Sequence, residues 1–522
     1  MPGRDPRTPE EIERDWLRRR RKRWTRRSVV IGSVVLGALL LISVPVIRIS
    51  TAIPGTNPGA VERAHELVDR FQPDGADPLG GNAHEMLVRI TERVSAIHDE
   101  RSSMFVEAVE QDSSLDESWS SYYGYLDPHS FPSGVEIDEG DDDFPPDQHE
   151  AFNTLHHEHM IRLLEAITQD EELQGWLDEL AITLYARREQ PRGPAMQMLL
   201  PELGTTRRLA RINGAIMRWA RMEHDDARVV RAFEHSLALA RVLAHQLTLI
   251  DRLVAESVVA MTLRPVTEFA VSGSCDAETM RGMSRAIERQ LPLPSIELAL
   301  LGERFMLVDY VERTHSAGAG YLLPEEIERW GVGRGASPTI RNVPGLFEPR
   351  KDETLALIDE ITDLVVSAAR TRWVERDSDV FDAIEQRSFG NPILEHLVPA
   401  YAKAVRTIDA GQAQLDGARL VLAVETYRLD HGGELPDALE ALVPSYVAEL
   451  PEDAYAPDGR YRYRILDEPD QHLRAYLVYT VGRDGEDNEG AEHPDDTEAG
   501  LRGSTLLIEG HDFVFNRPRE SD

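Results

Sequence analysis

Cysteine and aromatic residues are scarce in this chain. Its 522 residues include one cysteine, Cys275, so no intrachain disulfide can form and the fold does not depend on oxidation. Aromatic residues make up 7% of the sequence, against 41% apolar and 29% charged residues, which is the balance of a folded globular protein. Alanine, leucine, glutamate and arginine are plentiful and favour helix. We therefore expect two or three mostly helical domains with ordinary hydrophobic cores.

Positive charge is also in short supply. The chain has 57 lysine and arginine residues against 92 aspartate and glutamate residues, a net charge of −35. Residues 1–27 depart from this pattern, with 11 basic and 5 acidic residues. Phosphate contacts need clustered lysine and arginine, so an acidic body disfavours nucleic-acid binding. Such a surface keeps a protein soluble and is open to divalent cations.

The common motifs of nucleophilic, nucleotide-binding and redox sites are missing. The sequence has no G-x-S-x-G, Walker A, G-x-G-x-x-G or C-x-x-C pattern. The densest imidazole cluster is His156, His157 and His159 with Glu158 between them, and His149 lies upstream. His156 and His159 can share a helix face, although zinc enzymes commonly use His-Glu-x-x-His spacing. Two interpretations stay open, an exposed helix start or a divalent-metal site of a hydrolase.

One long apolar run stands near the N-terminus. Ser28–Ile47 contains 20 residues without a charge, which at about 1.5 Å per residue spans the hydrocarbon core of a bilayer. The positive-inside rule then predicts a basic cytoplasmic tail at 1–27, a transmembrane helix at 28–47 and a Pro/Gly-rich linker at 48–59. We expect a single-pass protein of the cytoplasmic (inner) membrane, with its N-terminus in the cytoplasm and its body outside. A cleaved signal sequence is the alternative.

Residues 60–410 read as a helical body. Apolar residues recur at helical spacing through most of it, and residues 113–148 are expected to interrupt it as a flexible acidic loop. The longest helical region, 205–270, divides into segments joined by a polar turn near Asp225. Paired helices of this length resemble tetratricopeptide-type hairpins, but no second clean copy follows at that period. We therefore describe the body as helical-hairpin or repeat-like rather than as a repeat array.

Residues 411–522 predict a small α+β domain with an antiparallel sheet. An amphipathic helix from Gln412 ends at His431-Gly432-Gly433, where glycine can adopt the left-handed conformation that stops a helix. The short runs RYRYRIL and AYLVYTV then read as strands, and the acidic loop GRDGEDNEG follows the second.

This order resembles the globular domain of the type II secretion major pseudopilin, a type IV pilin-like protein of bacteria. The resemblance covers about a fifth of the chain. It implies a helix, a leucine-rich loop, a small antiparallel sheet and a calcium-binding loop. The matching residues are Tyr427, His431, Gly432, Pro436, Leu439, Leu442, Pro444, Leu450, Pro451, Tyr479, Thr480, Gly482, Asp484 and Gly485.

The calcium ligands expected from this resemblance are Thr480, Asp484, Asp487 and Asp512. Calcium takes six to eight oxygens, which a glycine-bearing acidic loop can supply. The chain departs from the family after Gly485, where a long acidic stretch replaces a short closing loop, and the spacing is not that of an EF-hand. The alternative is a solvated hairpin loop without a cation.

Most of the chain also resembles a group of uncharacterised bacterial single-pass membrane proteins. They combine a helical body containing a Gly-Glu-Arg-like helix, here 302–304, with a final domain ending in an Asp-x-Val-Phe-like strand, here 512–515. The resemblance implies no known activity.

Together these patterns predict a membrane-anchored envelope protein that is not an enzyme. It would bind or scaffold unidentified envelope proteins, beside a secretion or pilus-like system. It is not expected to polymerise as a pilin, because 28–47 lacks the glutamate of pilin helices and roughly 360 residues separate it from Gln412. The alternatives are a metal-dependent envelope hydrolase that uses His156–His159, and a helical body that binds a peptide or polysaccharide in a concave groove.

Overall fold

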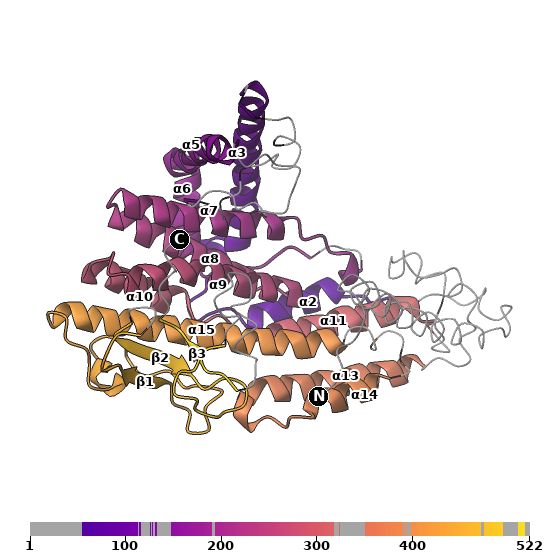
Figure 1. Cartoon of the computed structure of the whole chain (residues 1–522). Helices are drawn as coiled ribbons and strands as arrows, with labels where there is room; N and C mark the ends of the chain where they lie inside the picture. Colours follow the sequence, from indigo (N-terminus) through magenta and orange to yellow (C-terminus); the bar gives the residue numbers. More distant parts are fainter. Residues whose placement is uncertain are drawn as a thin grey trace, which may run out of the picture. The chain divides into compact units, whose positions relative to one another are not determined.

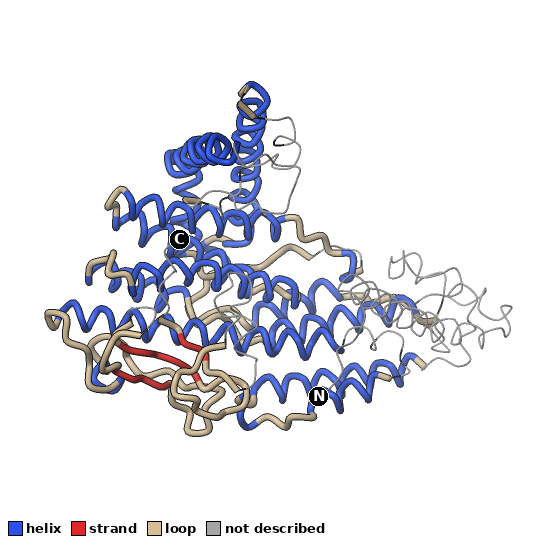
Figure 2. Tube along the Cα trace, in the orientation of Figure 1, coloured by secondary structure: helices blue, strands red, loops and turns tan. Residues whose placement is uncertain are grey.

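The protein is mostly helical and carries one small antiparallel sheet, as the computed structural model shows (Figures 1 and 2). The structure describes residues 55–112, 148–190, 194–317, 350–389, 398–470, 474–493 and 510–516, with a few isolated positions between them. Most of the acidic stretch predicted at 113–148 and all of the predicted tail at 1–27 lie outside the described residues. The coarse prediction of a mostly helical chain with a small antiparallel sheet is thus confirmed.

The prediction of a transmembrane protein is corrected by the structure, as far as its described residues go. None of the helices there is both long enough and apolar enough to span a bilayer. Ser28–Ile47, the stretch from which the prediction was drawn, lies outside the described residues.

The chain divides into two compact units. The smaller comprises residues 1–59, 193–197 and 306–358, and the larger comprises 60–192, 198–305 and 359–522. In the smaller unit the carboxylate of Asp309 accepts hydrogen bonds from the Asn57 amide at 2.8 Å and from the backbone N–H of Ala195 at 2.9 Å. This one buried carboxylate therefore joins three separate segments of the smaller unit.

Helices make up most of the described residues. They are α2 (Ala60–Arg70), α3 (Ala83–Gln111), α5 (His149–Gln169), α6 (Glu171–Ile182), α7 (Glu202–Met222), α8 (Asp226–Ala244), α9 (Leu249–Val271), α10 (Ala277–Gln290), α11 (Glu297–Thr314), α13 (Lys351–Arg370), α14 (Val380–Ser388) and α15 (Val398–Asp430).

Polar caps set several of the helix boundaries. The side chain of Asp170 accepts the backbone N–H of Leu173 at 2.9 Å, which separates α5 from α6 in a segment that reads as one helix in the sequence. Asp225 caps α8 in the same way through the N–H of Arg228. His224 precedes it with a φ of 58°, so the backbone turns sharply between α7 and α8.

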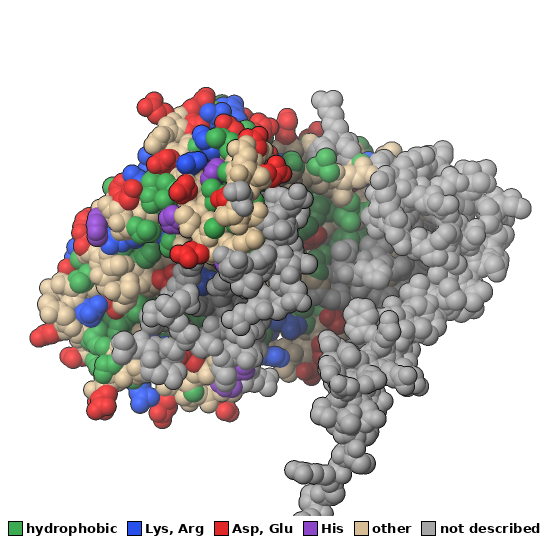
Figure 3. Space-filling model, turned by 45° about the horizontal axis from the view of Figure 1, so that its top comes forward, with side chains coloured by type: hydrophobic (Ala, Val, Ile, Leu, Met, Phe, Trp, Pro, Cys, Tyr) green, Lys and Arg blue, Asp and Glu red, His purple; other side chains and the backbone are tan. Residues whose placement is uncertain are grey.

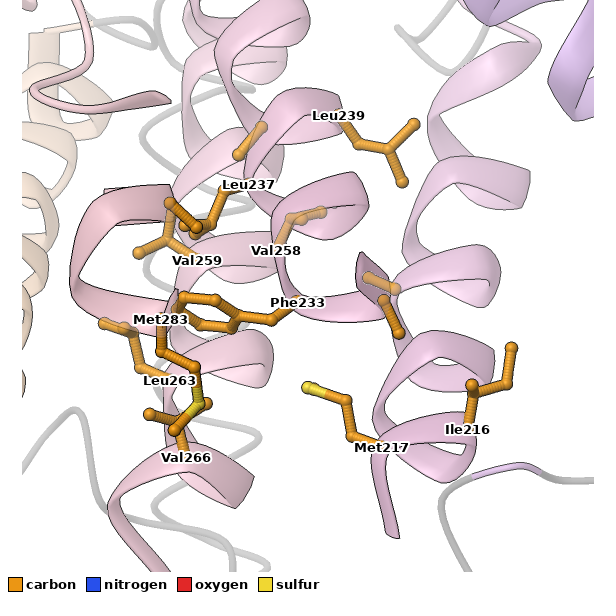
Figure 4. Close-up of a cluster of buried hydrophobic side chains, with 14 of the residues drawn as sticks. Ile216, Met217, Phe233, Leu237, Leu239, Val258, Val259, Leu263, Val266 and Met283 are labelled. Atoms are coloured by element: carbon orange, nitrogen blue, oxygen red, sulfur yellow. The ribbon is translucent and has the colours of Figure 1, made fainter. Parts of the chain in front are cut away.

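Helices α7 to α10 contribute to a large hydrophobic core to which α3, α5, α6 and α15 also contribute. Figure 4 shows Met217 of α7, Phe233 and Leu237 of α8, Val258 of α9 and Met283 of α10 gathered in one cluster, and all five are buried. Fully burying a side chain of this size stabilises the fold by about 1.5–3 kcal/mol. Packing of amphipathic faces, rather than helix propensity alone, thus holds these helices together.

The sheet lies along α15 (Figure 1). Its order is β1 (Arg462–Ile465), β2 (Tyr476–Thr480) and β3 (Phe513–Val514), with antiparallel pairing throughout. Arg462 pairs with Tyr479, and Thr480 pairs with Phe513. All residues of the central strand β2 are buried, because it lies between two strands and against α15.

Candidate functional site

The acidic loop after β2 is the calcium site that the sequence predicts. Its first predicted ligand, Thr480, is fully buried and donates a hydrogen bond to the carboxylate of Asp453 at 2.9 Å. That carboxylate also accepts the backbone N–H of Tyr455 at 2.9 Å. Burial raises the pKa of Asp453 to about 6, although both hydrogen bonds favour its charged form. Thr480 therefore joins the end of β2 to the turn at 453–455.

Two of the predicted carboxylate ligands hold the loop by hydrogen bonds. The carboxylate of Asp484 accepts the backbone N–H of Gly510 at 2.6 Å, which ties the loop to the residues before β3. Asp487 accepts the Tyr479 hydroxyl at 3.0 Å and forms an ion pair with Arg462 at 3.1 Å. These contacts connect the loop to β1 and β2.

The fourth predicted ligand, Asp512, is the most deeply placed of the three carboxylates. It is 2% exposed and accepts the backbone N–H groups of Asn488 at 3.0 Å and Gly490 at 2.7 Å. Burial raises its pKa, and the negative charge of Asp487 adds to this effect, while the two N–H groups oppose it. Asp512 thus fixes the closing turn of the loop.

The predicted ligands do not converge on a single point. No group of three or more histidine, cysteine, aspartate or glutamate side chains surrounds a possible metal position anywhere among the described residues. A calcium ion needs six to eight oxygens, whereas Asp484, Asp487 and Asp512 direct theirs at N–H and O–H donors. The residues do not fit a preformed calcium site in this conformation, and calcium binding stays a prediction.

Replacing Asp512 by alanine is expected to lower the free energy of unfolding by about 1–3 kcal/mol, because two backbone N–H groups lose their acceptor. Denaturation in EDTA would measure this loss. Asp467→Ala is the control, since Asp467 is exposed. A loss that appears only when calcium is present would contradict this account, because it would show that a cation holds the loop.

Two of the three clustered histidines are buried, so the interpretation as an exposed helix start is wrong for them. His156 and His159 on α5 are 2% and 6% exposed. Their rings lie 5.5 and 5.6 Å from the ring of Phe105 on α3, centroid to centroid. Burial lowers the pKa of His159, and the positive charge of Arg162 lowers it further. The two imidazoles therefore belong to the packing between α3 and α5.

A buried ionic cluster joins α7 and α9. The Arg188 guanidinium donates to both carboxylate oxygens of Asp251 at 2.7 Å and to Glu202 at 2.9 Å. None of these three side chains is more than 7% exposed. Burial alone would raise the pKa of Glu202, but the hydrogen bond with His84 and the charge of Arg188 lower it to about 2. The charged groups of this cluster are therefore buried and paired with one another.

A groove lies between α3 and α7, and the sequence analysis does not predict it. It encloses about 790 Å³ and is open on one side. The α3 wall includes Asp99, Ser102 and Glu107, and the α7 wall consists of Arg208 and Arg211. A volume of this size is typical of small-molecule sites.

A sequence signal for this groove exists in α7. From Leu203 to Met222 the chain contains five arginines and no acidic residue, in a protein with an excess of acidic residues. Arg208 and Arg211 therefore have no carboxylate within four positions along their own helix, where a helical ion pair would form. What the sequence does not reveal is that both side chains face α3.

Comparisons with known proteins give this chain no relative. No family model matches it, and no curated protein and no solved structure matches it either.

Proposed function

We propose that this chain is a binding or scaffolding protein of the cell envelope, whose C-terminal α+β domain presents the acidic loop at 481–490 to a partner protein. The observation that carries the proposal is the course of α15. This helix packs against α9 and α10 of the helical body and also against β2 of the sheet. Helix α15 thus fixes the C-terminal domain to the helical body, while the loop stays exposed at the surface.

Polar contacts reinforce both sides of α15. The Glu425 carboxylate accepts the Tyr476 hydroxyl of β2 at 2.8 Å in a buried position. On the other side, Arg281 of α10 donates to Asp430 at 2.6 Å. Gly411 is a close-packed position, because a Cβ atom there would lie 2.5 Å from the Glu256 carboxylate of α9. The loop is thereby connected to the body through one continuous helix.

An association with a secretion or pilus-like system is part of the proposal and comes from the pseudopilin resemblance. In pilins the helix of the globular domain continues from an N-terminal hydrophobic helix. Here α15 begins at Val398, after α14, and its length is taken up by contacts with the body. This arrangement supports a fixed binding module rather than a polymerising subunit.

The alternative of a metal-dependent hydrolase receives no support from the packing of its residues. His156 and His159 contact Phe105 in the interior, whereas a hydrolytic centre needs open access to its substrate.

Partner capture at the loop provides the test. A photo-crosslinking residue placed at Glu486, which is exposed, should join the protein to a partner in intact cells, whereas one at Glu171 should not. The double variant Glu486→Gln/Glu489→Gln should reduce the yield of this product about tenfold, because rim charges steer association. Glu171→Gln/Glu172→Gln removes the same charge from α6 and should leave the yield unchanged. The same products from both positions would defeat the proposal.

A further inference from the structure

Helix α7 is rich in arginine, although the chain as a whole is strongly acidic. Most arginines of the larger unit are ion-paired, and Arg231 with Asp178 and Arg281 with Asp430 are examples. Acidic and basic side chains are accordingly interspersed on the face seen in Figure 3. Arg208 and Arg211 differ, because no carboxylate of the described residues lies within 4 Å of either guanidinium group. Within the described part of the chain, these two permanent charges at the groove therefore have no ion-pair partner.

The groove is a built feature of the fold. Leu126 is fully buried and forms part of its wall. The imidazole of His98 lies 3.1 Å from the carbonyl oxygen of Leu126, and since a carbonyl only accepts, Nε2 carries the proton. The N–H of Leu126 donates to the Ser102 hydroxyl at 3.3 Å. These two bonds, one helical turn apart on α3, fix the wall.

The two arginines are held opposite this wall. Helices α3 and α7 are joined by a hydrogen bond between the hydroxyls of Ser95 and Thr205 at 3.1 Å. Arg208 and Arg211 follow Thr205 by about one and two turns. Burial lowers the pKa of His98, and the nearby charge of Arg208 lowers it further, which agrees with a cationic side chain close to the wall.

We propose that this groove binds a small organic oxyanion, a carboxylate or a phosphate ester, that also carries O–H or N–H donors. Guanidinium groups pair with carboxylate and phosphate oxygens through parallel N–H donors. On the opposite wall Asp99 and Glu107 repel a polyanion but accept from hydroxyl or amino groups. The enclosed volume of about 790 Å³ suits a small molecule.

This site is separate from the proposed loop and does not depend on it. Arg208 and Arg211 belong to α7, whereas the loop belongs to the C-terminal domain after β2. Variants of Glu486 and Glu489 should therefore leave oxyanion binding unchanged, so failure of one proposal does not affect the other.

Calorimetric titration of the full chain tests the site with four compounds. Gluconate supplies a hydroxylated carboxylate, glycerol 3-phosphate a hydroxylated phosphate ester, inorganic phosphate the bare ion and glycerol the neutral control. We expect at least one of the two organic oxyanions to bind with a dissociation constant of about 1 mM or lower, and glycerol not to bind. The preferred compound will distinguish carboxylate from phosphate recognition.

Two variants test whether the oxyanion binds in this groove. Arg208→Gln/Arg211→Gln should weaken binding at least tenfold. Arg207→Gln is the matched control, because Arg207 is exposed on the same helix but does not line the groove, and binding should not change. Unchanged melting temperatures would show that the variants fold. The proposal is overturned if neither organic oxyanion binds, if only inorganic phosphate binds, or if Arg207→Gln weakens binding as much as the double variant.

Discussion

Replacing Arg188 by methionine is expected to lower the free energy of unfolding by about 3–5 kcal/mol. The methionine side chain fills much of the space but leaves Asp251 and Glu202 buried with no cation between them, at 0% and 4% side-chain exposure. An uncompensated buried charge costs far more than a lost surface ion pair. Chemical denaturation at pH 7 would measure the loss.

The neighbouring residue provides the matched control. Arg187 donates to Asp69 at 2.7 Å, but the two side chains are 30% and 44% exposed. Solvent screens such a pair, so Arg187→Met should change stability by about 1 kcal/mol or less. Equal losses from the two variants would show that Arg188 acts only through general charge and not through its buried partners.

The pH dependence of the Arg188 variant follows from the same cluster. In the wild type the pKa of Glu202 is lowered from 4.5 to about 2, so its stabilising effect is present above pH 4.5 and is lost as the pH falls toward 2. Without Arg188 the carboxylate protonates more readily. The stability difference between wild type and variant should therefore be largest near pH 7 and should narrow below pH 4.5.

The sequence predicts the helices well because local signals determine them. Apolar periodicity and capping residues such as Asp225 mark α7 and α8 without reference to distant segments. The break between α5 and α6 is harder to predict, because the apolar pattern continues across Asp170. Only the cap that Asp170 provides to the Leu173 N–H marks the start of α6. The same pattern does not predict α14, which is short.

The candidate sites are less predictable because they depend on which distant elements meet. The sequence leaves His156 and His159 open to two interpretations, an exposed helix start or a metal site, whereas in the structure α5 turns both rings toward Phe105 of α3. Thr480 is named as a calcium ligand, yet its partner is Asp453, 27 positions away. The groove of Arg208 and Arg211 exists only because α3 lies opposite α7.

The second large effect on stability is expected at Gly302. The packing around this residue also gives a structural reason for the Gly-Glu-Arg sequence at 302–304. A Cβ atom there would lie 1.7 Å from the carbonyl oxygen of Leu247, far closer than van der Waals contact allows. The next residue, Glu303, accepts the backbone N–H of Leu249 at 2.8 Å and so caps α9. Arg304 forms an ion pair with Asp359 of α13. Each residue of the motif thus has a structural task.

Gly302→Ala is therefore expected to lower the free energy of unfolding by about 3 kcal/mol or more. The new methyl group must push α11 away from the turn between α8 and α9, and overpacking against rigid backbone costs about 1–3 kcal/mol. The displacement also removes the Glu303 cap, and an unpaired buried N–H costs about 1–3 kcal/mol more. Thermal and urea denaturation of the purified full chain would measure the combined effect.

Gly175→Ala is the matched control because it makes the same change inside helix α6. Nothing lies within 4 Å of a Cβ atom at Gly175, so this substitution should stabilise the protein by about 0.5–1 kcal/mol through helix propensity. If Gly302→Ala does not yield folded protein, Glu303→Ala still tests the contact, because it removes the cap without adding a methyl group at position 302. A Gly302→Ala variant that is as stable as Gly175→Ala would show that α11 does not approach Leu247 as closely as the structure has it.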